Sequence, residues 1–242
     1  MMLPISSVEA LAASVIVFVA AWVQGSIGFG LAVVAAPLLV LIEPDLVPAP
    51  LILNGLLLTF LIAYRERRSI DMGGIVWATI GSMGGMAAAG GVLLVISPFG
   101  FTVLFCTLVF AAVGLSALGR TIHPTRRSAL VAGVLSGFMG TTSSIGGPPV
   151  ALLYQNLPPP RLRGTLSAFF CITGVMALGV LGAVGKLGWT ETKLALPLLP
   201  GLVIGYALSG FTAGVLDRYP ARPAVLVLSG LSAVGVLLRE LL

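Results

Sequence analysis

Charged side chains are scarce in this chain of 242 residues: they make up 9% of it, whereas a soluble globular domain carries about 25%. Hydrophobic residues make up 58%, and the mean hydropathy is +1.12. Such a chain could not cover a surface that faces water, so we predict an all-α, polytopic membrane protein with the lipid bilayer around it. The net charge of +5 does not indicate a nucleic-acid partner, because the arginines fall in short connections between apolar runs.

Cysteine and histidine are nearly absent as well. Cys106 and Cys171 stand alone in apolar segments, so we predict no disulfide, metal site or cofactor. His123 lies between arginines in a polar connection, and no charged or histidine side chain lies well inside the apolar segments. These absences argue against a membrane-embedded enzyme, which would need a nucleophile and a base or a metal cluster. Because Met1–Ser7 lacks the basic region of a signal peptide, we expect the N-terminal helix to stay part of the fold.

What the chain does have is glycine and proline inside its apolar runs. The stretch Gly140–Asn156, GTTSSIGGPPVALLYQN, places three glycines and two prolines within ten residues, in a run without a charged side chain. A regular helix cannot continue there. We predict that one helix breaks and that another begins at the prolines. Irregular backbone at membrane depth is tolerated only where protein buries it or where it lines a cavity, so the break is a candidate binding site.

The stretch Gln24–Leu39, QGSIGFGLAVVAAPLL, is the N-terminal counterpart of this break. Its Ser-Ile-Gly matches the Ser-Ile-Gly of the second stretch, 118 residues further along the chain. Two further short matches between the halves follow in the same order, at offsets of 119 and 123 residues. We therefore predict two homologous repeats, at residues 1–118 and 128–242, joined by a polar linker at 119–127. Each repeat would contain a broken, re-entrant-like helix pair.

The apolar runs predict eight membrane segments if each broken pair is one folded-back unit, or ten if both of its pieces cross. With folded-back pairs, ten positively charged residues fall on one side of the membrane and three on the other; with single crossings the split is nine to four. The first arrangement follows the positive-inside rule better. It corresponds to an inverted repeat with both termini outside.

The two breaks favour a small oxyanion as ligand. Exposed backbone N–H groups, the positive end of a helix and hydroxyl donors attract an anion without a full positive charge, and glycine lets the backbone approach it closely. For Asn54 and Thr173, helix packing is an equal alternative. The predicted substrate-binding residues are Gln24, Ser26, Gly28, Gly30, Asn54, Thr142, Ser143, Ser144, Gly146, Gly147, Gln155 and Thr173.

The motifs GSIGFGLAVVAAPLL (Gly25–Leu39) and GTTSSIGGPPVALLYQ (Gly140–Gln155) resemble those of the TauE/SafE family of sulfite and organosulfonate exporters, which are bacterial anion permeases. The resemblance covers essentially the whole chain. It implies movement of sulfite, sulfoacetate or a related sulfur-containing anion across the inner (plasma) membrane. Phe29 and Leu31 stand where many relatives have a denser glycine cluster, and this difference leaves the anion open.

Alternatives remain at this stage. The chain could transport another small anion such as a carboxylate, or it could be a non-transporting membrane protein that binds a partner, although such a protein would not need two matched breaks. A homo-oligomer is compatible with the sequence. Without an interior carboxylate or histidine, a proton gradient could act only through protonation of the substrate, and the other choice is a uniport driven by the membrane potential.

Overall fold

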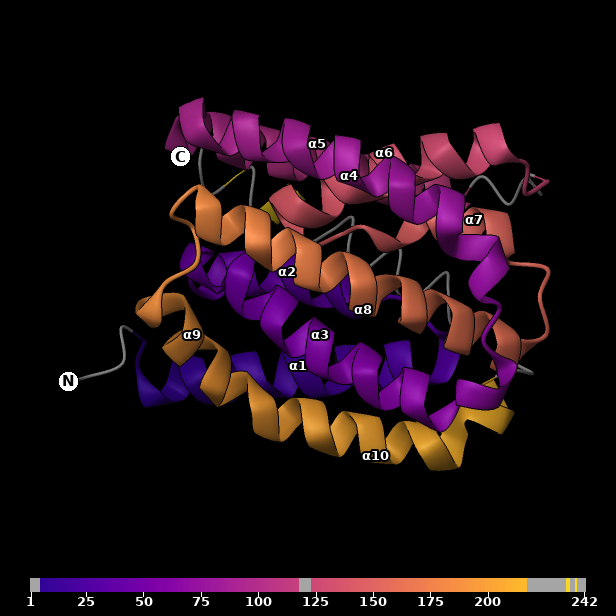
Figure 1. Cartoon of the computed structure of the whole chain (residues 1–242). Helices are drawn as coiled ribbons and strands as arrows, with labels where there is room; N and C mark the ends of the chain where they lie inside the picture. Colours follow the sequence, from indigo (N-terminus) through magenta and orange to yellow (C-terminus); the bar gives the residue numbers. More distant parts are fainter. Residues whose placement is uncertain (1–4, 118–122, 217–233, 236–237, 239–242) are drawn as a thin grey trace.

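The computed structural model describes residues 5–117, 123–216, 234–235 and 238, and the described part of the chain is all-helical (Figure 1). The α-helices are α1 (Ser7–Ile27), α2 (Leu31–Ile42), α3 (Ala49–Arg65), α4 (Met72–Val95), α5 (Pro98–Ala117), α6 (Arg126–Ser143), α7 (Gly147–Tyr154), α8 (Pro159–Ala183), α9 (Trp189–Ala195) and α10 (Leu199–Leu216). Short 3₁₀ turns lie at Pro44–Leu46, Arg67–Ser69 and Leu196–Leu198.

Six helical segments within these ranges are long and apolar enough to cross a membrane. They are Ser7–Ile27, Pro44–Arg65, Met72–Val95, Pro98–Ala117, Pro159–Ala183 and Trp189–Ala213. The chain is therefore a multi-pass membrane protein, as its composition predicts. Pro98 separates two of these spans, because α4 ends at Val95 and α5 begins at Pro98. The apolar run at 224–238, which the sequence predicts as one more span, lies almost wholly outside the described residues.

Polar side chains at the helix ends explain where these helices begin. Ser6 caps α1, and its Oγ accepts a hydrogen bond of 3.2 Å from the backbone N–H of Glu9, whose carboxylate accepts in return from the N–H of Ser6. Thr125 and Ser128 form the same reciprocal pair at the start of α6. Each pair satisfies N–H groups that a helix N-terminus leaves without a partner.

Glycines allow two pairs of long helices to pack with their backbones in contact. Helix α4 packs along α6, and α1 packs along α10. A Cβ added to Gly85 of α4 would lie 2.0 Å from the carbonyl oxygen of Val134, and one added to Gly201 of α10 would lie 1.9 Å from that of Ser14. Small residues drive such close helix contacts in membranes, where the hydrophobic effect supplies no force between helices.

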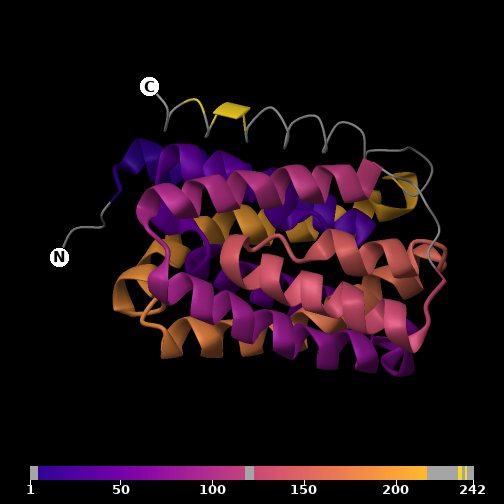
Figure 2. The same ribbon diagram turned by 90° about the horizontal axis from the view of Figure 1, so that it is seen from above.

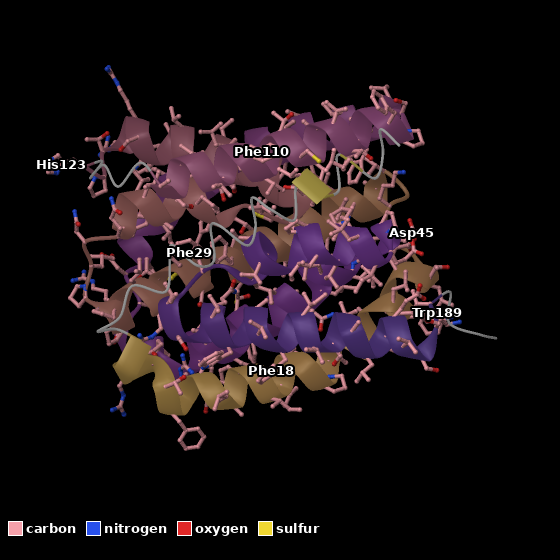
Figure 3. The ribbon with its side chains drawn as sticks, turned by 180° about the vertical axis from the view of Figure 1, so that it is seen from behind. Phe18, Phe29, Asp45, Phe110, His123 and Trp189 are labelled. Carbon is pink, nitrogen blue, oxygen red and sulfur yellow. The ribbon has the colours of Figure 1, made fainter. Side chains whose placement is uncertain are left out.

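The two ends of the bundle differ in charge. Figure 3 shows Asp45 and Trp189 at one end and His123 at the other. We call the His123 end the arginine-rich end. Among the described residues it carries Arg65, Arg67, Arg68, Arg126, Arg127, Arg161 and Arg163, together with Glu66 and Asp71. The opposite end carries the described residues Lys186, Lys193, Glu9, Glu43, Asp45 and Glu191.

Substitution of two neighbouring glycines of α4 tests this packing. We expect Gly85→Ala to lower the free energy of unfolding by about 1–3 kcal/mol, because the added methyl group overlaps the backbone of α6. Gly84→Ala is the matched control, since nothing lies within 4 Å of a Cβ at Gly84. Thermal unfolding of the purified variants in detergent measures the difference. Equal melting temperatures of the two variants would contradict the packing described.

Candidate functional site

The first helix break is made by two glycines and closed by one side chain. Helix α1 ends at Ile27 and α2 begins at Leu31. Between them Gly28 and Gly30 have φ angles of +103° and +124°, which side-chain-bearing residues rarely adopt. Gln24 spans the break, because its Oε1 accepts a hydrogen bond of 2.9 Å from the N–H of Leu31, the first residue of α2.

The second break lies between α6 and α7. Ser144 follows α6 with a φ of 65°, and its N–H donates to the carbonyl oxygen of Gly140 at 2.9 Å. Ser136 donates from Oγ to the carbonyl oxygen of Gly146 at 2.6 Å, which fixes the irregular backbone. Helix α7 then begins at Gly147 with two prolines in its first turn, as predicted. Figure 2 shows this stretch inside the bundle.

A cavity of about 100 Å³ lies between the two breaks. We call it the central cavity. Helices α3 and α8 complete its wall with residues such as Gly55, Thr59 and Phe170, and none of its lining residues is charged. Six of the twelve predicted binding residues line it: Gln24, Gly30, Ser144, Gly146, Gly147 and Thr173.

The electrostatic character of the central cavity comes from helix ends. The N-termini of α2 and α7 both reach its wall, at Gly30–Val33 and Gly146–Gly147. The first N–H groups of a helix have no partner within it, and the helix end carries roughly half a positive charge. In the first turn of α7 the N–H of Gly147 is such a group, whereas Pro148 and Pro149 have none. Since the Oε1 of Gln24 accepts from Leu31, the amide nitrogen of Gln24 is the donor that this side chain can offer to a ligand. The wall thus offers a ligand hydrogen-bond donors without a full positive charge.

Three predicted hydroxyls lie within the helices. The breaks are narrower than expected, so Ser26 belongs to α1, and Thr142 and Ser143 belong to α6. Each hydroxyl donates to the carbonyl of the residue four positions earlier in its own helix, at 2.7 to 2.8 Å. Such bonds let Ser and Thr continue a helix, and none of these three residues lines the central cavity.

The other predicted residues outside the central cavity are placed by packing. A Cβ on Gly28 would lie 3.0 Å from the Cα of Arg163, so Gly28 allows α1 to meet α8. Asn54 donates to the carbonyl oxygens of Pro50, at 3.1 Å, and Ala195, at 3.0 Å, and thereby joins α3 to α9. Gln155 lines a second, smaller cavity.

Sequence reasoning missed three charged residues that hold the end of α1. Arg65 donates from Nη2 to the carbonyl oxygen of Gly25, and Arg163 donates from Nη1 to that of Ser26 at 3.1 Å. Glu66 lies between the two guanidinium groups, with Oε1 at 3.2 Å from Nε of Arg163 and 3.4 Å from Nε of Arg65. We call these three residues the arginine clamp.

The arginine clamp satisfies backbone groups that the break exposes. The last carbonyl groups of a helix have no partner within it, and α1 ends inside the protein. The sequence analysis assigned the arginines to polar connections between apolar segments, where a side chain is expected to face water. Arg163 is nevertheless buried, with only 6% of its surface exposed. The break at Gly28 was the available signal, because it implied carbonyl groups in need of donors.

Removal of one clamp arginine tests this role. We expect Arg163→Gln to lower the free energy of unfolding by about 3–5 kcal/mol, because it breaks a buried ion pair and removes the donor to Ser26. Arg161→Gln is the matched control: the ion pair of Arg161 with Asp71 is exposed and should contribute less than about 1 kcal/mol. Chemical denaturation in detergent measures both. Equal losses for the two variants would contradict a structural role for the clamp.

Comparison with known proteins agrees with the motifs. Residues 13–236 match the family model described as Sulfite exporter TauE/SafE. No curated protein and no solved structure shows a significant match to the chain. The family match covers nearly all of the chain, including both helix breaks and the helices that line the central cavity. The chain therefore belongs to the sulfite exporter TauE/SafE family, a family of membrane transporters rather than enzymes.

Proposed function

We propose that this protein is a permease that exports sulfite or a related small sulfur-containing anion, and that the anion binds in the central cavity between the two helix breaks. Family membership supports anion export. The observation that carries the binding site is that the N-termini of α2 and α7 reach one cavity whose lining residues are all uncharged. Half-helix N-termini that point at an anionic group are a recurring device of transporters.

Binding without a fixed positive charge suits transport. A substrate must bind well enough to enter and weakly enough to leave. The partial charges at two helix ends and the amide of Gln24 attract an oxyanion, whereas a buried arginine or lysine would hold it more strongly. Ser144 and Thr173 also line the cavity, but their hydroxyls donate to the carbonyl oxygens of Pro48 and Phe169, so the donors for the anion are the helix ends and Gln24. A small anion with several acceptor oxygens fits this set of donors.

The helix pairing supports two repeats of opposite orientation. In the first half α1 leads into a break and the short helix α2, and in the second half α6 leads into a break and the short helix α7. The contact of α4 with α6 has its counterpart in that of α10 with α1, while α3 packs against α8. Two repeats related by a two-fold axis would produce this exchange of partners. Alternating access would then follow from movement of one repeat against the other.

Charge supports the orientation. Of the described positively charged residues, seven lie at the arginine-rich end and two at the opposite end. The positive-inside rule therefore places the arginine-rich end in the cytoplasm and the N-terminus outside, in the inner (plasma) membrane. The six apolar spans, the α6–α7 pair and the predicted segment at 224–238 give eight membrane units. A negative membrane potential would favour exit of an anion.

Sulfite flux through Gln24→Glu tests the binding site. The carboxylate keeps the shape of the amide and can still accept from Leu31, but it places a negative charge at the central cavity. We expect sulfite efflux from liposomes to fall by about tenfold or more, because a like charge within a few ångströms repels the anion. Efflux is followed while the membrane potential and the pH gradient are set independently.

Thr142→Ala is the control for this experiment, since the hydroxyl of Thr142 donates within α6 and does not line the central cavity. Its flux should stay close to that of the wild type. Normal flux through Gln24→Glu would remove the central cavity from the transport path. If the wild type retains sulfite, a panel of sulfonates and carboxylates decides whether another anion is the substrate.

Chemical labelling tests the orientation. We expect the Trp189→Cys variant to react with a membrane-impermeant maleimide added to intact spheroplasts, because Trp189 is exposed at the end opposite the arginines. The His123→Cys variant should react with the maleimide only after the membrane is opened. The reverse pattern would place the arginine-rich end outside the cell.

A further inference from the structure

A second cavity, of about 30 Å³, lies next to the central cavity at the first helix break. The two cavities share Phe29, Gly30 and Val33 in their walls. The central cavity has Gln24 as a polar group, and the second cavity has Ser116 and Gln155. Two mainly apolar cavities, each with a few polar side chains, therefore meet at Phe29, Gly30 and Val33.

The second cavity lies toward the arginine-rich end. Gln155 follows α7, and the hydroxyl of the preceding Tyr154 donates to the carbonyl oxygen of Gly74, in the first turn of α4. Ser116 is next to the last residue of α5, whose chain continues toward Arg126. An anion that moves between the arginine-rich end and the central cavity by this route has to pass Phe29.

The backbone around Phe29 is suited to such a passage point. Gly28 and Gly30 flank it with positive φ angles, so the ring projects from the irregular segment and not from a helix. Figure 3 shows Phe29 within the bundle, well away from both ends. Across from it, a Cβ on Gly147 would lie 3.5 Å from Cβ and Cδ2 of Phe29 and 3.7 Å from Cζ of Phe170. Gly147 and Phe170 therefore lie close to the ring of Phe29.

We propose that Phe29 is a selectivity-determining residue, which sets the size of the anion that passes between the central cavity and the second cavity. This inference rests on the proposed function. An apolar side chain at a narrow point excludes water and any solute too large to move past it. Sulfite is small, whereas an organosulfonate carries a carbon substituent on sulfur. The ring therefore discriminates against bulky sulfonates without contributing a charge.

The test compares the efflux of sulfite with that of benzenesulfonate from liposomes. We expect Phe29→Ala to raise the ratio of benzenesulfonate to sulfite flux by roughly tenfold or more, because steric discrimination by a few carbon groups is of this size. Phe29→Leu, which disturbs the fold less, should give an intermediate ratio. Phe29→Trp should lower the flux of both anions.

Two other phenylalanines serve as controls. Phe170 lines the central cavity only, so Phe170→Ala should change the concentration dependence of sulfite flux but leave the flux ratio within about twofold of the wild-type value. Phe110 is 41% exposed on α5, and Phe110→Ala should change neither quantity.

The outcomes separate this inference from the proposed function. If the wild type moves sulfite but Phe29→Ala and Phe29→Leu keep the wild-type flux ratio, Phe29 does not determine selectivity and only this inference is wrong. An equal rise of the ratio in Phe170→Ala would likewise overturn it, since that variant enlarges the central cavity alone. If the wild type moves neither sulfite nor any sulfonate, both the proposed function and the role of Phe29 are wrong.

Discussion

The structure depends on one constraint: in a membrane, backbone groups freed by a broken helix must find partners inside the protein. Both breaks meet it with nearby side chains. Gln24 accepts from the first N–H of α2, and the arginine clamp donates to carbonyl groups at the end of α1. Ser136 donates to Gly146 in the second break. Gln24 and Ser136 also line the central cavity, so they hold both breaks at its wall.

The two breaks are held by different chemistry. Charged side chains fix the first break: Arg65 of α3 and Arg163 of α8 donate to the end of α1 and share Glu66. Hydroxyl groups fix the second break, and the Oγ of Ser144 donates to the carbonyl oxygen of Pro48 at 3.1 Å. Around both breaks, glycine contacts bring α4 against α6 and α1 against α10. The site is thus positioned by long helices, although its walls contain irregular backbone.

Much of this arrangement was predictable because glycine and proline act locally. The helix ends near Gly28 and Ser144, the start of α7 at its prolines, and the membrane-spanning character all follow from short-range rules. The sequence did not indicate that Ser26 and Thr142 lie outside the central cavity, because a Ser or Thr that bonds within its own helix has the same sequence pattern as one that faces a cavity.

Long-range contacts account for the rest. The clamp joins residues 65, 66 and 163 to the end of α1, and nothing in the local sequence around them indicates those partners. The same holds for Asn54, which meets Ala195 across the bundle. The convergence of the two breaks on one cavity follows from the packing of α3 against α8. Family membership supports anion export, while the proposed position of the anion rests on the geometry of the breaks.

The most direct test of this account is to locate a bound oxyanion. Crystals of the protein soaked with selenite, a heavier analogue of sulfite, would show its position by the anomalous scattering of selenium. The account predicts a peak in the central cavity, with oxygen atoms within about 3.2 Å of backbone nitrogens at the N-termini of α2 and α7. A peak confined to the arginine-rich end, with the central cavity empty at saturating selenite, would contradict it.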